Sequence, residues 1–178
     1  MISPFSTRSG FEKLVDKEIN RAKAGKKAYM ILKMNSLEDR EMIELLYEAS
    51  QTGVKIRLIV RGICCLVPQV PGLSDNIEVI SIVDRFLEHA RVYIFGNGGK
   101  EKMYLASADW MTRNLDRRVE VVFPIYDAAL FQELRSIIDL QLADNVKARI
   151  IHPEKDNTYV EKNGKAVRSQ MAIYESLS

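Results

Sequence analysis

The sequence is poor in cysteine, in histidine and in excess charge. It has two cysteines and two histidines in 178 residues, and 26 basic residues nearly balance 24 acidic ones, for a net charge of +2. The cysteines, Cys64 and Cys65, are adjacent, which suits neither an ordinary disulfide nor a CxxC motif, and we expect both to be buried apolar packing. The small net charge excludes the overall basic field of a typical nucleic-acid binder, so any anion site must be local.

Long apolar runs and two common site motifs are also missing. There is no signal peptide and no run of about eighteen apolar residues, so we expect no membrane span and a cytoplasmic location, with peripheral membrane association left open. The run Gly96-Asn97-Gly98-Gly99-Lys100 lacks the spacing and the following Ser or Thr of a P-loop. No set of His, Cys, Asp and Glu has the spacing of a structural zinc site, and no metal ligand is predicted in this chain.

What the chain does have is an alternation of helical and strand periodicity. With 47% hydrophobic residues, it is long enough to bury one core, and one domain is expected. Apolar residues at helical spacing predict helices at residues 11–24, between Ser36 and Gly53, at 128–142 and from Ser169. Strands are predicted at residues 28–34, 54–60, 77–83, 92–95, 103–106 and 118–123, and a small hairpin from 146–151 and an Asn163-Gly164 turn.

The first two strands and the helix between them form a strand-helix-strand unit, which favours parallel pairing. Ser36 is the predicted cap of that helix, and Asp39 lies in its first turn, near the favourable end of the helix dipole. The second strand is followed by a Pro- and Gly-containing segment, residues 61–76, which is predicted to be a loop. Ligands of open α/β sheets bind at the carboxyl ends of strands, so this loop marks the expected site.

His89, one of the two histidines, is the candidate site residue, and four arginines are candidates to surround it. The planar guanidinium group of arginine can bind two phosphate oxygens at once. The four arginines are Arg61, Arg85, Arg91 and Arg113. Each residue also has a plainer reading. A lone histidine is often structural, and an arginine that ends a strand is often only exposed to solvent. Asp109 and Arg113 would pair with each other if their segment were helical.

Other conspicuous residues are interpreted as structural. Trp110 is expected to pack in the core, because a tryptophan brings a large apolar area. Asp84 and Glu88, four residues apart, are interpreted as one solvated helix face rather than as metal ligands or a general-base pair. His152, beside Pro153, is expected at the surface.

His89 and Arg91, followed by Ala106-Ser107-Ala108-Asp109, resemble the His-x-Lys and Gly-Ser-x-Asn pattern of phospholipase D-like phosphotransferases. Arg91 replaces the lysine, Ala106 the glycine and Asp109 the asparagine. Longer runs resemble the C-terminal catalytic region of bacterial polyphosphate kinases of the first family, over about residues 3–178. These runs are Leu58–Leu66, Ser74–Ile77, Ser81–His89 and Ser107–Asn114.

The resemblance implies one phospholipase D-like α/β domain over residues 1–178, the second such domain of its enzyme, with a mixed, largely parallel sheet flanked by helices. It implies reversible transfer of the terminal phosphoryl group of ATP to polyphosphate, through a phosphohistidine in the preceding domain. The implied partners are ATP or ADP, polyphosphate, the preceding domains and other subunits of a homo-oligomer. Mg²⁺ is implied as the cofactor, with its ligands outside this chain.

The family places ATP-phosphate contacts at the positions of Arg61 and His89. His89 would act as a general acid/base or an electrostatic stabiliser, with Arg91, Asp109 and Arg113 in support, and the isolated chain is expected to be inactive. Two alternatives remain open: a non-catalytic module that binds ATP or polyphosphate, and half of a phosphodiesterase site. The second is weakened because the chain has one altered half-pattern, with Gly96 where the pattern has an acidic residue, although a homodimer would supply two halves.

Overall fold

A computed structural model describes residues 1–154, 156–162 and 164–177. Its helices are α1 (Thr7–Lys23), α2 (Arg40–Gln51), α3 (Thr112–Asp116), α4 (Ala128–Leu142) and α5 (Ser169–Leu177), with a 3-10 turn, η1 (Asn97–Gly99). Its strands are β1 (Tyr29–Met34), β2 (Lys55–Val60), β3 (Ile77–Ile82), β4 (Arg91–Phe95), β5 (Lys102–Ala106), β6 (Val122–Pro124) and β7 (Ala148–Ile150).

The strands form one seven-stranded sheet in the order β6-β5-β4-β1-β2-β3-β7. The mixed α/β class is confirmed, and so is the parallel pairing of β1 with β2 across the α2 crossover. The expectation of a largely parallel sheet is wrong: β2 and β3 are also parallel, but the other four pairings are antiparallel. For β4 and β5 the reason is the short connection through η1, which allows only antiparallel neighbours, whereas β1 with β4 and β3 with β7 are strands far apart in the sequence.

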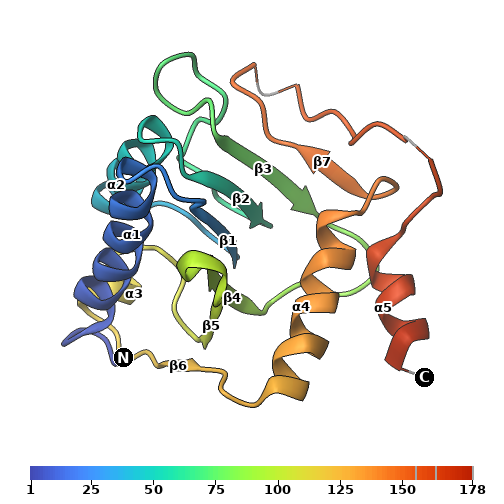
Figure 1. The fold of residues 1–178 in the computed structure, drawn as a ribbon. Coiled ribbons are helices and arrows are strands. Elements are labelled where there is room, and N and C mark those ends of the chain that lie inside the picture. The colour runs from blue at the N-terminus through green and yellow to red at the C-terminus, as the bar shows by residue number, and fades with distance from the viewer. Residues whose placement is uncertain (155, 163, 178) are drawn as a thin grey trace.

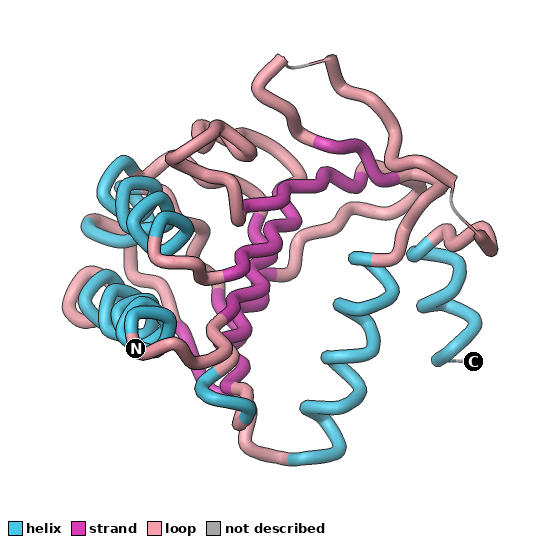
Figure 2. Tube along the Cα trace, turned by 45° about the horizontal axis from the view of Figure 1, so that its top comes forward, coloured by secondary structure: helices cyan, strands magenta, loops and turns pink. Residues whose placement is uncertain are grey.

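Helices cover both faces of the sheet, with α1 and α2 on one face and α4 and α5 on the other (Figure 1; Figure 2). The alternation of β1 divides its side chains between them. Met30, Leu32 and Met34 join the core beneath α1 and α2, whereas Ile31 faces α4. Among the described residues, no helix is long and apolar enough to cross a bilayer.

The core beneath α1 and α2 contains a cluster of three aromatic rings. Phe11, Tyr93 and Trp110 are all fully buried, so the structural reading of Trp110 is confirmed. The Phe11 ring lies 4.6 Å from that of Tyr93 and 5.4 Å from that of Trp110, between centroids. The Tyr93 hydroxyl donates a 2.7 Å hydrogen bond to the carbonyl of Ala108, which fastens the segment after β5 to this core.

Helix α2 begins later than predicted. Leu37 forms bridges with both Cys64 and Trp110, so the chain is extended through Ser36 and cannot begin a helix there. Asp39 is the cap instead, and its carboxylate accepts from the Met42 N–H at 3.1 Å. Arg8 from α1 binds the same carboxylate at 2.7 Å and so ties the two helices together.

Two further predictions are corrected, and a third is confirmed in part. Cys65 is exposed, whereas Cys64 is partly buried and its burial raises the thiol pKa to about 11. Strand β6 begins at Val122 rather than at Arg118, because the N–H of Arg118 still bonds back to the carbonyl of Arg113 in α3; Val121 forms an isolated bridge with Ile2. In the tail, residues 148–150 and 158–160 pair antiparallel, as the predicted small hairpin requires, and β7 also pairs with β3. The predicted Asn163-Gly164 turn includes a position outside the described residues.

Candidate phosphate site

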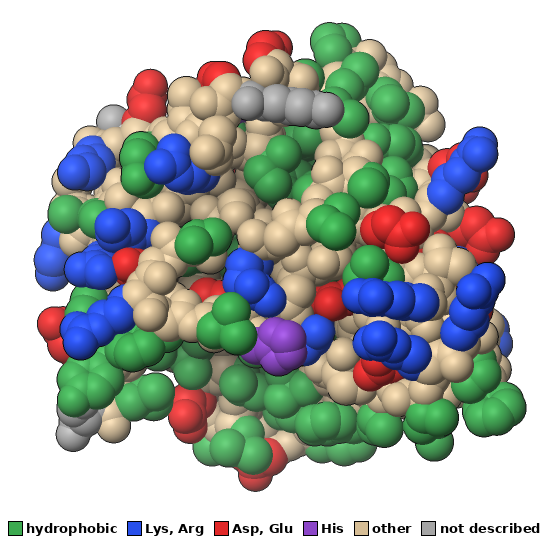
Figure 3. All heavy atoms as spheres, turned by 180° about the vertical axis from the view of Figure 1, so that it is seen from behind, with side chains coloured by type: hydrophobic (Ala, Val, Ile, Leu, Met, Phe, Trp, Pro, Cys, Tyr) green, Lys and Arg blue, Asp and Glu red, His purple; other side chains and the backbone are tan. Residues whose placement is uncertain are grey.

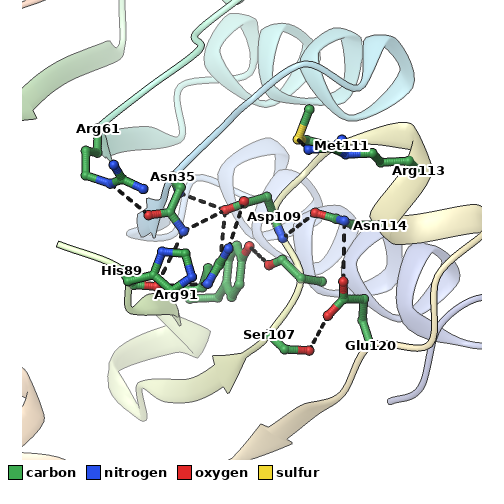
Figure 4. Close-up of polar contacts among 12 residues, drawn as sticks. Asn35, Arg61, His89, Arg91, Ser107, Asp109, Met111, Arg113, Asn114 and Glu120 are labelled. Carbon is green, nitrogen blue, oxygen red and sulfur yellow. Dashed lines mark hydrogen bonds and ion pairs between the residues drawn. The ribbon is translucent and has the colours of Figure 1, made fainter. Parts of the chain in front are cut away.

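Four chain segments meet at one edge of the sheet. The carboxyl ends of the parallel strands β1 and β2 lead to Asn35 and Arg61, and the antiparallel β4 begins at the same edge with Arg91, two residues after His89. Asp109 follows β5, which pairs with β4. These side chains gather around Asn35 and Asp109 in Figure 4.

Asn35 links the two residues that were expected to bind phosphate. Its side-chain oxygen accepts from Arg61 Nε at 3.0 Å, and its amide nitrogen donates to the carbonyl of His89 at 3.4 Å. Its backbone N–H donates to Asp109 Oδ1 at 2.7 Å, and the residue is only 5% exposed. Sequence reasoning missed Asn35, although a polar residue directly after a buried strand, at its carboxyl end, is a usable signal.

Arg91 and Asp109 hold each other in a bidentate ion pair. Arg91 Nε lies 3.1 Å from Asp109 Oδ1, and Nη2 lies 3.0 Å from Oδ2. The third nitrogen, Nη1, donates to the carbonyl of His89 at 2.9 Å. Two of the departures from the phospholipase D-like pattern, Arg91 and Asp109, are therefore partners. Every guanidinium nitrogen of Arg91 is used within the protein, where Arg91 fixes the backbone of His89.

Two groups at this edge keep free hydrogen-bonding capacity. Neither Nη atom of Arg61 has a hydrogen bond or ion pair within the described part of the chain, since its side chain binds Asn35 through Nε alone. The described contacts of His89 run through its carbonyl, and its imidazole is exposed and unpaired among the described residues. On the face shown in Figure 3, a histidine side chain lies among hydrophobic and basic side chains.

Arg113 and Arg85 do not join this group. Arg113 is exposed on α3, contacts the Met111 sulfur at 3.8 Å, and points away from His89 (Figure 4). Arg85 lies over the ring of Phe86, with its guanidinium carbon 5.6 Å from the ring centroid. The alternative pairing of Asp109 with Arg113 is wrong, because Asp109 precedes α3 and its carboxylate binds Arg91.

The prediction that Asp84 and Glu88 form one solvated helix face is also wrong. Residues 83–90 are not helical. Asp84 forms an ion pair with Arg168 at 2.7 Å, and Glu88 forms one with the buried Lys33 at 3.0 Å. The second histidine, His152, is partly buried two residues after β7.

The site does not have the ligands that a divalent cation would need. Within the described ranges, no three His, Cys, Asp or Glu side chains are grouped so that they could hold a metal ion. Asp109, the acidic residue at the edge, is already occupied by Arg91 and Asn35. The described residues therefore do not fit Mg²⁺, which prefers oxygen ligands in a near-octahedral arrangement.

Comparison with known proteins assigns this chain to a family. Residues 1–170 match the family described as polyphosphate kinase C-terminal domain 2. The chain belongs to the polyphosphate kinase family. It is 53% identical to the polyphosphate kinase of Vibrio cholerae over 178 residues, which cover 99% of this chain and 25% of that protein. The chain thus spans about a quarter of the length of the curated relatives that it matches.

Solved structures agree with this assignment. The crystal structure of polyphosphate kinase from Porphyromonas gingivalis matches 99% of this chain and 27% of that chain, with 46% identity and a TM-score of 0.96. Nuc from Salmonella typhimurium, a phospholipase D family member, matches 85% of this chain and 95% of that one, with 12% identity and a TM-score of 0.58. That second likeness is one of fold alone, and it confirms the predicted phospholipase D-like fold.

Proposed function

We propose that this chain is the part of a polyphosphate kinase that contacts the phosphates of ATP, and that Arg61 and His89 make those contacts. The observation that carries the proposal is that Asn35 holds Arg61 Nε and the His89 carbonyl, while the Nη atoms of Arg61 and the imidazole of His89 have no partner among the described residues. A guanidinium held by one nitrogen offers its remaining donors in the geometry that phosphate oxygens accept.

The proposed reaction is reversible transfer of the terminal phosphoryl group of ATP to a polyphosphate chain. Phosphoryl transfer builds charge on the equatorial oxygens, and catalysis consists mainly of positioning and electrostatic stabilisation. Arg61 would bind these oxygens and keep its charge throughout. His89 would donate a hydrogen bond to a phosphate oxygen, or act there as a general acid/base. Arg91 and Asp109 would support His89 by holding its backbone, and Arg113 would have at most an indirect part.

The remaining machinery is assigned to the rest of the enzyme. Residues 1–178 would form one domain, the second phospholipase D-like domain, and a preceding domain would carry the histidine that becomes phosphorylated. Mg²⁺, which would neutralise phosphate charge when bound, would have its ligands outside this chain. ATP or ADP, polyphosphate, the preceding domains and a homo-oligomeric assembly are the proposed partners, and a cytoplasmic location remains a prediction.

A phosphodiesterase half-site is less well supported. The position of the pattern's lysine is occupied by Arg91, whose nitrogens are all used by Asp109 and the carbonyl of His89. The likeness to Nuc concerns the fold only, because the identity is 12%. No feature of the described chain favours this alternative over phosphate binding for a kinase.

Calorimetric titration of the chain with ATP and with inorganic triphosphate tests the proposal. Arg61→Ala should weaken binding of both ligands about 10-fold or more, because a hydrogen bond to a charged group contributes about 1.5–3 kcal/mol. The matched control is Arg57→Ala, an equal loss of charge at an exposed position on β2, the strand that precedes Arg61. Equal weakening by both variants would show only a general charge effect and would contradict a site at Arg61.

Labelled ATP with Mg²⁺ then separates the proposed division of labour from its alternatives. The chain should bind ATP without acquiring acid-labile phosphate and without making polyphosphate. Labelling that is lost in His89→Ala would make His89 itself the phosphoryl carrier and would overturn the assignment. If the full-length enzyme bound ATP but showed no turnover, the chain would be a binding module instead.

A further inference from the structure

His89 lies in a segment without regular secondary structure, yet its backbone is held from both directions. Residues 83–90 connect β3 to β4 and are neither helix nor strand. The carbonyl of His89 accepts hydrogen bonds from Arg91 at 2.9 Å and from Asn35 at 3.4 Å. The residue before it, Glu88, is fixed in a different way, through its side chain.

The Glu88 carboxylate is bound by three side chains from three elements. Lys33 of β1 lies 3.0 Å from Oε2, and Gln141 of α4 donates to the same oxygen at 2.8 Å. Gln170 of α5 donates to Oε1 at 2.9 Å. Lys33, Gln141 and Gln170 are only 3%, 3% and 5% exposed. We call these four residues the Glu88 cluster.

Gln170 also forms hydrogen bonds with the backbone of Phe86, two residues before Glu88. Its side-chain oxygen accepts from the N–H of Phe86 at 2.8 Å, and its side-chain nitrogen donates to the carbonyl of Phe86 at 2.9 Å. Residues 86–88 are thus tied to α5 by three hydrogen bonds from one glutamine. Since α5 begins at Ser169, this glutamine lies in its first turn, where Asp144 holds the N–H of Ser169 at 2.8 Å.

Stability alone is a poor explanation for this cluster. Burial lowers the pKa of Lys33, and the Glu88 carboxylate opposes that effect. The free-energy cost of removing both charges from water therefore offsets much of the attraction between them. Buried ion pairs of this kind add little net stability compared with apolar packing, although removing one partner is costly. The cluster instead restricts the loop of residues 86–88 to one arrangement, directly beside the exposed imidazole of His89.

We propose that Glu88 is a positioning residue for His89, and that the Glu88 cluster makes α4 and α5 part of the support of the phosphate site. The inference rests on the proposed phosphate-binding role of His89. Without the cluster, residues 86–89 would sample several conformations, and the imidazole would have to be ordered each time a phosphate binds. With it, that ordering is completed during folding.

The direct variant, Glu88→Gln, leaves the buried Lys33 without a counter-ion and can unfold the chain, so the test uses Gln170→Ala, which changes no charge. Its control is Gln132→Ala, an exposed glutamine on α4. Two quantities are measured in the 178-residue chain: the order of the backbone amides of residues 86–89, from heteronuclear NOE values without ligand, and the affinity for inorganic triphosphate.

Gln170→Ala should reduce the amide order at residues 86–89 while the NOE values of β1 and β2 stay unchanged. It should weaken triphosphate binding about 2- to 10-fold, which corresponds to ordering one side chain on binding. Combined with His89→Ala, it should cause no further loss of affinity, because its effect passes through His89. A purely structural residue would weaken binding in both backgrounds, and that result would overturn the proposal.

If Gln170→Ala does not fold, Gln141→Ala removes one hydrogen bond to Glu88 and carries the same two measurements. Unchanged order at residues 86–89 in a folded variant would also refute the positioning role. Failure of the phosphate hypothesis gives a different result. In that case triphosphate does not bind the unsubstituted chain, while the order measurement, made without ligand, still decides whether the cluster fixes the segment.

Discussion

The two faces of the sheet are built in different ways. Beneath α1 and α2, the sheet is covered by a broad apolar core that includes Phe11, Leu58 and Trp110, all without exposed surface. Beneath α4 the buried apolar cluster is small, consisting of Ile31, Val92, Ile94, Met103 and Ile138. Only Ile138 and Gln141 of α4 are buried, and Gln141 connects the helix to the site segment through its hydrogen bond to Glu88.

The two faces of the sheet have different roles. The apolar face fixes the fold, because burial of apolar area supplies most of the favourable free energy of folding. The polar face fixes a loop, because hydrogen bonds are directional and specify one arrangement of residues 86–89. An open cavity of about 690 Å³ at the start of α4, lined by residues that include Tyr104, Tyr126 and Phe131, fits the looser packing of this second face.

Matched phenylalanine truncations on the two faces should show the largest difference. Phe11→Ala removes a fully buried ring in contact with Tyr93 and Trp110, and should cost about 3–5 kcal/mol of unfolding free energy. Phe131→Ala, at a partly buried position on α4, should cost about 1 kcal/mol. Urea unfolding followed by circular dichroism measures both. Equal costs would remove the distinction between the two faces.

Asp144, two residues after the end of α4, should be the most important polar residue of the second face. Its carboxylate accepts from the N–H groups of Val146, Lys147, Ala148 and Ser169, and from the Ser169 hydroxyl at 2.6 Å. Asp144→Ala should cost about 2–4 kcal/mol, because buried donors lose a charged acceptor. Loss of less than about 0.5 kcal/mol in urea unfolding would show that α5 is held mainly by other contacts.

The same carboxylate should make stability depend on pH. Burial alone would raise the pKa of Asp144, but the hydrogen bonds from Ser169, Lys147 and Val146 outweigh it and lower the pKa. A depressed folded-state pKa means that the stabilisation is complete above the ordinary value of about 4 and is lost as the pH falls through the folded-state value. Between pH 6 and pH 3, the unfolding free energy of the unsubstituted chain should therefore fall more than that of Asp144→Ala.

Arg8→Ala should have a smaller effect on the apolar face. Arg8 binds Asp39, Glu41 and Asp116, and Asp39 is 2% exposed, so the substitution leaves one buried carboxylate without its cation. The expected cost is about 1–3 kcal/mol, and Arg8→Lys should recover only part of it, because lysine cannot bind several carboxylates with a planar fork. Full recovery by lysine in thermal unfolding would show that charge alone matters.

Arg113→Ala should have the smallest effect. Its side chain is exposed and contacts only the sulfur of Met111 among the described residues. The unfolding free energy should change by less than about 0.5 kcal/mol, and triphosphate affinity should fall no more than with the control Arg57→Ala. A larger loss of affinity would place Arg113 in the phosphate site, against its position in the structure.

Periodicity and local signals were sufficient for most of the elements. The apolar spacing in residues 128–142 predicted α4, and the strand-helix-strand unit predicted the parallel pair of β1 and β2. The position of Arg61 at the end of a strand followed from the same reasoning. The runs that contain Arg61, His89 and Asp109 were specific enough to indicate the family, which the match over residues 1–170 confirms.

The rest depended on tertiary contacts that no local pattern encodes. Asn35 links Arg61, His89 and Asp109 only because β1 lies between β2 and β4 in the sheet. Glu88 was assigned to a solvated helix face because its spacing from Asp84 is helical, whereas its partners Lys33, Gln141 and Gln170 are far away in the sequence. The start of α2 moved to Asp39 because Leu37 is held by distant strand-like bridges.

Nuclear magnetic resonance of the two histidines tests the central claim most directly. The sequence contains only His89 and His152, so titration with inorganic triphosphate reports on a candidate site residue and an internal control in one experiment. The account predicts that the imidazole signals of His89 shift and saturate, that those of His152 do not move, and that Arg61→Ala weakens the response. Equal shifts at both histidines, or none at His89, would contradict a phosphate site at this edge of the sheet.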